Sequence, residues 1–364
     1  MNTIERALMH ALFIHLHHNP DRAVDFEAIE ELNRKVEQES PASLIVGPGD
    51  DAAVIGTPGS PDSLVLKMES HCSPCVPRPY EAAYTCVSGN LRDVVAMGGR
   101  PFALLNFVGT RPLHEKVLVG PCGFEGICHC GNCIEMTSKE RLDLIMQGIR
   151  DACEMMGVYI VGGGFSTSFS DIVPAVVGAV VGKMVAREPL TKPAKSAGDN
   201  IILIGTTGKD GNDTLFRAGV VSKMEPAKPA YGLERITMEV TLAAFGTGKV
   251  HACSDLGAAG LGAGVCESAR YGGFGAKVEL SSVPLGNGMI SPEEILICET
   301  QARMLLQVAP EDVNEVLKVI WSHNASAAVI GEITDDDKEV FTFEGETVAT
   351  IPNSPSEEIL KELS

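Results

Sequence analysis

The sequence predicts two domains of the α/β or α+β class, because strand-like and helix-like patterns alternate in both halves of the chain. Its 364 residues are enough for roughly two domains of about 100–200 residues each. A polar, Pro-rich stretch at 186–200 separates the two halves and is the best boundary between them. We therefore expect a helical extension at 1–40, a first domain at 41–185, a second domain at 186–352 and a tail at 353–364.

Charge and composition narrow the class of protein. The formal net charge is −19 at pH 7, so a basic nucleic-acid-binding surface is not expected. No stretch approaches the roughly 18 consecutive apolar residues of a membrane span, and Glu5 stands where a signal peptide would carry positive charge. Eleven cysteines without a secretory leader favour a reducing compartment. We expect a cytoplasmic protein that binds neither nucleic acid nor membrane.

In the first domain, apolar spacings of three and four residues predict helices, and alternation or short apolar runs predict strands. Helices are expected at 3–17, 25–38, 80–97 and 138–157. Strands are expected at 43–46, 52–55, 64–69, 101–109, 158–161 and 172–182. Gly98-Gly99 and Pro101 are stop signals for the helix at 80–97. Ser138 starts the last helix, but Arg141 at its third position leaves a capping box incomplete.

The second domain repeats the alternation. Its strands are expected at 201–204, 251–255, 276–285, 303–310 and 327–333, with a hairpin at 339–351. Its helices are expected at 212–222, 231–246 and 310–321, with a helix of small residues after Asp255.

The residues that carry chemistry gather around the loops of this pattern. Two adjacent carboxylates follow a Gly-Pro-Gly turn, where a divalent cation would relieve their repulsion. Further carboxylates, a lysine, a histidine and an asparagine follow; the whole set is Asp50, Asp51, Lys67, Glu69, His71, Asn90, Asp93 and Asp255. Such a set is typical of Mg²⁺–nucleotide binding. A P-loop is excluded, because GxxxxGK[ST] is absent around 205–210.

A glycine triplet and a group of cysteines are less specific signals. Gly162, Gly163 and Gly164 follow a predicted strand, where the backbone can approach a phosphate or a neighbouring element. The cysteines form two CxxC pairs with two further thiols nearby: Cys72, Cys75, Cys122, Cys128, Cys130 and Cys133. They fit a zinc or iron–sulfur site, a redox-active thiol, or small buried apolar side chains.

Seven segments resemble, in the right order, the aminoimidazole ribonucleotide synthetase superfamily of ATP-dependent enzymes. They are GPGDDAAVI, VLKMESH, GNLRDVVAMGGRPFALLN, GICHCGNCI, GTTGKDG, SDLGAAGL and SPEEILICETQARMLLQV, and they cover about residues 44–330. Within the superfamily they are most similar to phosphoribosylformylglycinamidine synthases, which convert an amide to an amidine. The resemblance implies two α/β domains, the first forming a barrel across a dimer interface, with ATP in a cleft there.

The resemblance also implies roles for individual residues. The Mg²⁺ ligands would be Asp51, Asp93 and Asp255. ATP would be bound by Asp50, Lys67, Glu69, Asn90 and the glycines Gly162, Gly163 and Gly164. Catalysis would fall to His71 and Lys67, and the substrate side would comprise Glu299, Gln301 and Asp210.

The sequence also departs from the amidine-forming enzymes. Their tandem duplication is a single copy here, so a homodimer would be needed. Their ESHNHP segment reads ESHCSP, and their Gly-Gly-acid reads Gly163-Gly164-Phe165, without the carboxylate.

The functional expectation is an ATP- and Mg²⁺-dependent enzyme that phosphorylates an amide or carbonyl oxygen for attack by a nitrogen or sulfur nucleophile. A glutaminase or another ammonia or sulfur donor is a possible partner. Two alternatives stay open. One is a cofactor-maturation or sulfur-transfer paralogue with a cysteine-bound metal, and the other is a non-catalytic nucleotide-binding subunit.

Overall fold

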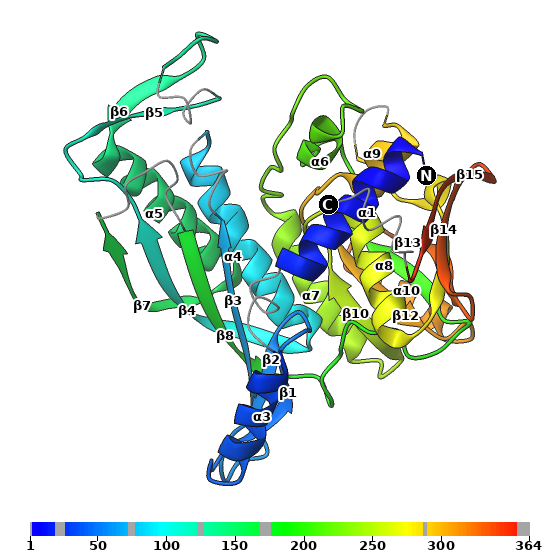
Figure 1. Ribbon diagram of the computed structural model, residues 1–364. Coiled ribbons are helices and arrows are strands. Elements are labelled where there is room, and N and C mark those ends of the chain that lie inside the picture. The colour runs from blue at the N-terminus through cyan, green and yellow to red at the C-terminus, as the bar shows by residue number, and fades with distance from the viewer. Residues whose placement is uncertain are drawn as a thin grey trace.

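The computed structural model describes residues 2–18, 26–71, 77–121, 127–167, 176–286 and 290–354 (Figure 1). Its helices are α1 (Thr3–His18), α3 (Phe26–Glu37), α4 (Pro79–Ala96), α5 (Ser138–Met156), α6 (Asp213–Arg217), α7 (Leu233–Phe245), α8 (Gly260–Gly272), α9 (Pro292–Ile297) and α10 (Val313–Ser322). Its first-half strands are β1 (Ser43–Val46), β2 (Ala53–Gly56), β3 (Ser63–His71), β4 (Gly99–Gly109), β5 (Lys116–Val119), β6 (Ile134–Thr137), β7 (Tyr159–Ser166) and β8 (Val176–Met184). The second half contributes β9 (Asn200–Ile204), β10 (Val250–Asp255), β11 (Gly275–Glu279), β12 (Met304–Val308), β13 (Ala327–Thr334), β14 (Lys338–Phe343) and β15 (Glu346–Pro352).

The first lobe is a six-stranded sheet in the order β1-β2-β3-β8-β4-β7. Helices α4 and α5 pack side by side and cover one of its faces (Figure 1). Successive side chains of a strand point to opposite faces, so Lys67 faces α4, where its amine contacts Asp93. Met68, the next residue of β3, is 71% exposed on the other face. The face opposite the helices therefore carries apolar side chains that the described residues leave exposed.

The second lobe is a seven-stranded sheet in the order β10-β12-β9-β13-β11-β14-β15. Its strand β9 has the unbroken apolar sequence Ile201 to Ile204, which is typical of a strand buried on both faces. Ile202 and Ile204 pack into the core that contains α7 and α10 residues. Ile201 and Leu203 pack into the other core, with residues of α1 and α8. Helices thus cover both faces of this sheet.

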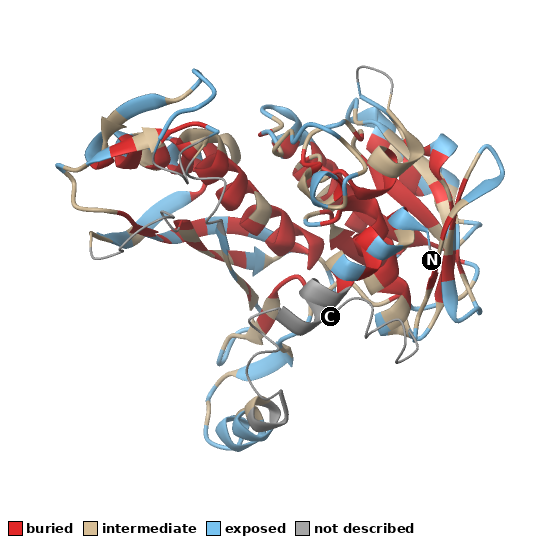
Figure 2. Cartoon of the chain, turned by 45° about the horizontal axis from the view of Figure 1, so that its top comes forward, coloured by how far each residue is buried: buried red, intermediate tan, exposed pale blue. Residues whose placement is uncertain are grey.

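Helix α4 joins the two lobes. It contacts β3, β4, β8 and α5 of the first lobe, and α7 and β10 of the second. Figure 2 shows it buried along most of its length, and one continuous apolar core runs from Val65 of β3 through Leu91 to Met238 of α7. A helix enclosed in this way places its polar residues inside the protein. Asn90, Arg92 and Asp93 are accordingly all buried.

The first two helices belong to different lobes. Ile4, Leu8 and Leu12 of α1 pack into the core of the second lobe, and Glu5 accepts a hydrogen bond of 3.0 Å from the Thr350 N–H in β15. Helix α3 instead contacts β1. No helix among the described residues is long and apolar enough to cross a membrane.

The predicted alternation of strands and helices is confirmed in both halves, with corrections at particular elements. The cap of α5 is Thr137 and not Ser138. Thr137 Oγ1 accepts from the Glu140 N–H at 3.2 Å, and Glu140 Oε2 accepts from the Thr137 N–H at 2.6 Å. The capping box is therefore complete, one residue earlier than expected.

Other elements differ in length or were not predicted. The strand expected at 276–285 ends at Glu279 and continues as a short 3₁₀ turn. The helix expected at 212–222 is only the five residues of α6. Helix α9 and the two-stranded ribbon of β5 and β6 were missed, because each is too short for periodicity to mark it.

Candidate active site

Three carboxylates from distant parts of the sequence meet at the junction of the lobes. Asp51 lies in the β1–β2 turn, Asp93 in the last turn of α4, and Asp255 at the end of β10. One oxygen from each carboxylate lies within 4.8 Å of the others. The Asp255 N–H also donates to Asp51 Oδ2 at 3.2 Å, which fixes the β1–β2 turn against the second lobe.

Three cations surround this carboxylate cluster. Lys67 Nζ lies 3.1 Å from Asp93 Oδ2, and Arg92 Nε lies 3.4 Å from Asp255 Oδ2. Lys192 Nζ lies 2.8 Å from Asp51 Oδ1 and 3.0 Å from Glu267 Oε2. Of these three cations, the sequence predicted only Lys67 as a site residue. Lys192 lies in the polar boundary at 186–200, three residues before another lysine, so no local pattern distinguishes it.

Burial disfavours the charged form of these carboxylates and so raises their pKa values. Burial raises the pKa of Asp51 and raises that of Asp93 well above its usual value. Burial and the neighbouring Asp51 raise the pKa of Asp50 to about 6. Burial also disfavours the charged form of Lys67, but the negative charges of Asp93 and Glu69 together outweigh this effect and raise the pKa of the Lys67 amine. The cluster therefore favours cations as neighbours.

The donor set fits a hard divalent cation. Mg²⁺ prefers oxygen ligands, and in nucleotide sites it is usually bound by protein carboxylates together with substrate phosphates. The three carboxylate oxygens that lie within 4.8 Å of one another are ligands of this kind. Asp50 lies beside the cluster, where its Oδ1 accepts the Lys192 N–H at 3.0 Å. Asp51, Asp93 and Asp255 are therefore the residues that would hold a divalent metal ion here.

Two further predicted residues line the same side of the sheet and helix. Asn90 precedes Asp93 by three residues, so the two share a face of α4. Its Nδ2 donates to the Cys86 carbonyl at 2.8 Å, while its buried Oδ1 has no hydrogen-bond partner among the described residues. Glu69 follows Lys67 by two residues on the helix-covered face of β3, and its carboxylate lies near Gly89. An unpaired buried acceptor is what a ligand donor would satisfy.

The predicted substrate-side residues lie in two neighbouring segments, because the Glu299 N–H donates to the Gly211 carbonyl at 2.9 Å. Gln301 Oε1 accepts from Arg92 Nη2 at 2.9 Å, which links it to the arginine at Asp255. Its Nε2 donates to the Glu299 carbonyl at 2.9 Å. Burial and the charge of Asp213 raise the pKa of Glu299 to about 8. Asp210 lies beside this segment, because its Oδ1 accepts a hydrogen bond from Thr300 Oγ1 at 3.3 Å. Asp210 and Thr300 line a pocket of about 380 Å³ together with Lys209 and Lys228.

The glycine triplet is not brought to the carboxylates within one chain. The structure places it inside β7 and not after a strand, where Gly163 and Gly164 pair in parallel with β4. A Cβ on Gly163 would lie 2.3 Å from Asn106 Oδ1, so this glycine allows close strand packing. Strand β7 is at the opposite edge of the sheet from β1.

The remaining predicted residues are only partly described. The side chain of His71 and the whole of Cys72, Cys75 and Cys122 lie outside the described residues. The sulfurs of Cys128, Cys130 and Cys133 lie within 4.8 Å of one another in the β5–β6 loop. Backbone N–H groups, first that of Cys133, lower the pKa of Cys128 to about 6.

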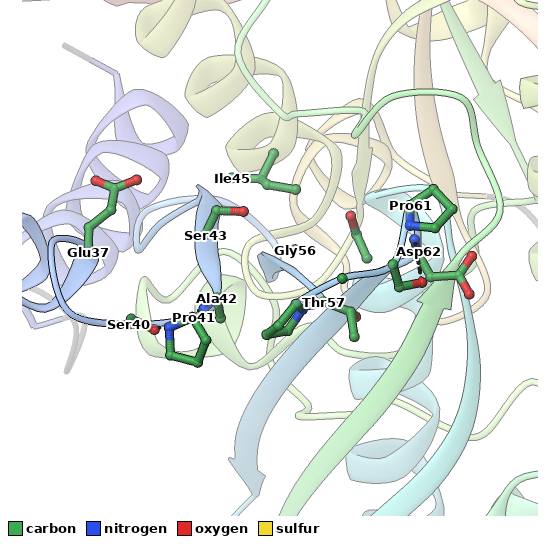
Figure 3. Close-up of a pocket in the computed structure, with 14 residues that line it drawn as sticks. Glu37, Ser40, Pro41, Ala42, Ser43, Ile45, Gly56, Thr57, Pro61 and Asp62 are labelled. Atoms are coloured by element: carbon green, nitrogen blue, oxygen red, sulfur yellow. Dashed lines mark hydrogen bonds between the residues drawn. The ribbon is translucent and has the colours of Figure 1, made fainter.

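A second pocket contains none of the predicted site residues. It measures about 510 Å³ and lies between the α3–β1 and β2–β3 turns. Figure 3 shows Ser43, Thr57 and Asp62 among the residues that line it.

Two family models and several known proteins match the chain. The AIR synthase related protein N-terminal domain matches residues 49–184, and the C-terminal domain matches residues 196–344. Phosphoribosylformylglycinamidine synthase subunit PurL of Methanosarcina mazei is 35% identical over 323 residues, which are 85% of this chain and 42% of the relative. The chain thus spans less than half the length of this curated relative.

Solved structures of T. maritima PurL have the same fold. The complex with ATP is 26% identical, covers 82% of this chain and 44% of that one, and has a TM-score of 0.65. The complex with FGAR is 26% identical, covers 86% and 47%, and has a TM-score of 0.68. With both domain models matched in order and this level of identity, the chain belongs to the AIR synthase related protein family.

Proposed function

We propose that the chain is an ATP- and Mg²⁺-dependent enzyme that activates an amide oxygen by phosphorylation and forms an amidine with a nitrogen nucleophile. The carboxylate cluster of Asp51, Asp93 and Asp255, with Lys67 beside it, carries this proposal. The identity with PurL, which has been solved in complexes with ATP and with FGAR, supports the same reaction class.

Each of the site residues has a proposed role that follows from its chemistry. Asp51, Asp93 and Asp255 would hold Mg²⁺, which when bound offsets the negative charge of the phosphates. Lys67 acts as a point charge on a phosphate oxygen. His71 is the proposed general acid–base, because imidazole is the side chain that most often transfers protons in catalysis. The proposed ATP-binding residues are Asp50, Glu69, Asn90, Gly162, Gly163 and Gly164, and the proposed substrate residues are Glu299, Gln301 and Asp210.

The reaction is a two-step substitution at the amide carbon. The amide oxygen attacks the terminal phosphorus of ATP, the amide nitrogen loses its proton, and ADP leaves. The nitrogen nucleophile then adds to the activated carbon and gives up a proton to His71. His71 returns this proton to the phosphate, which leaves with the former amide oxygen. The nitrogen would come as ammonia from a glutaminase or another donor protein.

We infer that a second copy of the chain covers the open face of the first sheet and closes a barrel with it. Met68 and Leu105 both pair with Ala179, so they share that face, and Phe107 follows Leu105 by two residues. These three side chains are 71%, 46% and 38% exposed. A contiguous apolar face of this kind is typical of an interaction surface. A second copy would also provide another glycine triplet for the nucleotide. We also infer that the domains divide within 186–200.

Turnover of the purified protein tests the proposed function. The assay measures ATP hydrolysis and amidine formation from formylglycinamide ribonucleotide and ammonium, with Mg²⁺ present. We expect Asp93→Asn and His71→Ala to lose at least about 100-fold in kcat, the scale of a lost acid–base or charge-stabilising group. Asp62→Asn is the matched control, because the Asp62 carboxylate forms an exposed ion pair with Lys183 and is not one of the proposed site residues. Full activity of both site variants would refute the assignment.

The three-thiol cluster favours a second candidate function. A sulfur-transfer or cofactor-maturation enzyme would use the same ATP chemistry with a sulfur nucleophile. ATP turnover that needs a sulfide donor, and forms no amidine with ammonium, would favour this candidate over the first.

A further inference from the structure

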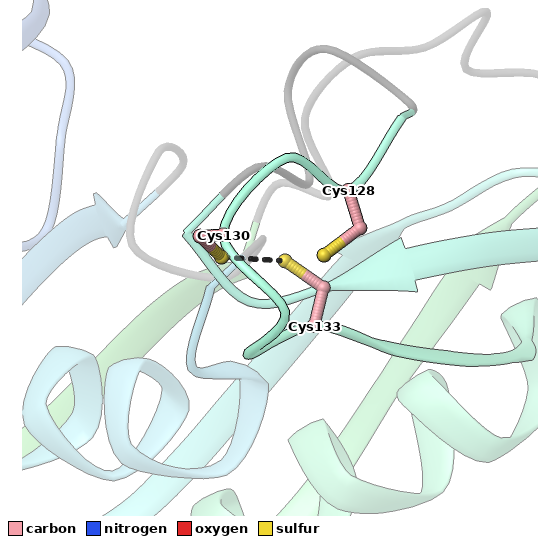
Figure 4. Close-up of side chains that lie close together, drawn as sticks. All are labelled: Cys128, Cys130 and Cys133. Carbon is pink, nitrogen blue, oxygen red and sulfur yellow. Dashed lines mark hydrogen bonds between the residues drawn. The ribbon is translucent and has the colours of Figure 1, made fainter.

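Three cysteines of the β5–β6 loop form a cluster that the proposed ATP chemistry does not use. Strands β5 and β6 pair as a separate two-stranded ribbon. In Figure 1 this ribbon lies at the far end of the first lobe, away from the second sheet. Cys128, Cys130 and Cys133 come from the loop that joins the two strands, and Figure 4 shows their sulfurs turned toward one another.

The spacing of the sulfurs fits a tetrahedral metal ion. Cys130 Sγ and Cys133 Sγ lie 3.7 Å apart, and all three sulfurs lie within 4.8 Å of one another. Zinc–sulfur bonds of about 2.3 Å in tetrahedral geometry put the sulfurs about 3.8 Å apart. One pair therefore already has the required separation, and the third thiol needs a shift of about 1 Å or less.

The loop backbone is arranged to stabilise thiolates. The Asn132 N–H donates to Cys130 Sγ at 3.4 Å. Gly131 has φ of 72°, a left-handed conformation that glycine adopts without strain, and it stands between Cys130 and the Asn132 N–H that donates to it. Thiolates, not thiols, are the form that binds metal.

Packing in the protein core does not account for these cysteines. Cys128 and Cys130 are exposed and Cys133 is partly exposed. The other described cysteines, Cys86, Cys153, Cys253, Cys266 and Cys298, are all buried. The expectation of small buried apolar side chains is therefore wrong for the three cysteines in the loop.

We propose that Cys128, Cys130 and Cys133 bind one Zn²⁺ through three thiolates and leave its fourth position to an exchangeable ligand. Soft thiolate ligands select Zn²⁺ over the hard cations that suit the carboxylate cluster. The bound ion would join the two ends of the short segment 128–133, which leads into β6. The two metal sites are thus separate in position and in ligand chemistry.

Zinc binding by the full-length protein tests this site. The protein is purified anaerobically with a reductant, stripped with a chelator, and titrated with Zn²⁺ against a chromophoric competitor. We expect the natural protein to bind one Zn²⁺ per chain at the cysteine cluster. Each of the variants Cys128→Ser, Cys130→Ser and Cys133→Ser should bind Zn²⁺ at least tenfold more weakly than the natural protein. Asn132→Ala is the matched control in the same loop, since it keeps the backbone N–H that donates to Cys130.

Two further measurements distinguish thiolate-bound zinc from zinc held by the carboxylates, from a disulfide and from an iron–sulfur cluster. Asp93→Asn should keep its Zn²⁺, because the carboxylate cluster is a different site. Titration with Co²⁺ should give sulfur-to-metal charge-transfer absorption that the serine variants lose, and bound Zn²⁺ should protect the three thiols from alkylation. Equal Zn²⁺ binding by all variants, a Cys130–Cys133 disulfide that persists under reductant, or iron with labile sulfide would overturn the proposal. None of these readouts depends on ATP turnover, so the proposed function stands or falls separately.

Discussion

Replacing Glu234 by glutamine measures how strongly one buried ion pair joins the two lobes. Arg92 of α4 and Glu234 of α7 are 2% and 0% exposed. Arg92 Nη1 lies 2.8 Å and 2.9 Å from the two Glu234 oxygens. The substitution keeps the shape of the side chain and removes its charge, which leaves a buried guanidinium without its main partner.

The structure sets the size of the expected effect. Breaking one side of a buried pair costs about 3–5 kcal/mol. Asp255 stays 3.4 Å from Arg92 Nε, and Gln301 still accepts a hydrogen bond from Nη2, so we expect about 3 kcal/mol, the lower end of that range. The unfolding entropy of a chain of 364 residues is about 0.8 kcal/mol/K. Glu234→Gln should therefore lower Tm by about 4 °C.

The same helix provides a matched control. Glu239 of α7 binds Arg100 through two hydrogen bonds of 2.8 and 2.9 Å. These side chains are 36% and 48% exposed, and exposed pairs contribute about 0–1 kcal/mol. Glu239→Gln should shift Tm by about 1 °C or less. The assay is thermal unfolding followed by circular dichroism, at low and high salt, since salt screens only the exposed pair. Equal losses in the two variants would refute the argument from burial.

Three other substitutions test the packing and the charges of the site. Burial, and then a nearby carboxylate, raise the pKa of Glu299 in the folded protein to about 8. The protonated side chain therefore contributes fully to folding stability below the pKa of the unfolded chain, and this contribution is lost as the pH rises through about 8. Glu299→Gln should therefore gain stability over the natural protein between about pH 4.5 and 8, and a flat difference in urea midpoints across that range would contradict this. Gly163→Ala should destabilise by about 1–3 kcal/mol through overpacking, whereas Gly164→Ala, with nothing within 4 Å of its Cβ position, should change stability by less than about 1 kcal/mol; similar urea midpoints for the two variants would argue against close strand packing. Lys192→Met removes the amine that lies 2.8 Å from Asp51 and competes with a metal ion for its carboxylate. Mg²⁺ should therefore raise the Tm of this variant more than the Tm of the natural protein, and equal Tm shifts would contradict Mg²⁺ binding by Asp51.

The individual residues of the carboxylate cluster were predictable, but their surroundings were not. Asp51, Asp93 and Asp255 each stand at the end of a predicted element or in a turn, and their matching segments indicated a common site. The pairing of Arg92 with Glu234 joins residues 142 positions apart, and no local pattern marks a contact of that range. A glutamate in the first turn of a helix is ordinary in sequence. Only its burial between the lobes makes it a partner for the arginine.

The sequence by itself determined the alternation of elements, because periodicities of two and about 3.6 residues record which side chains must be buried together. It did not determine which face of an element meets which partner. Strand β3 shows the difference: the pleat puts Lys67 on one face and Met68 on the other, but only the packing of α4 makes the first face a charged interior and leaves the second 71% exposed at Met68. The glycine triplet likewise became part of β7 because Gly163 and Gly164 pair with β4, a contact across more than fifty residues. Tertiary structure decided these points because they depend on which distant surfaces exclude water from one another, and that information is not local in the chain.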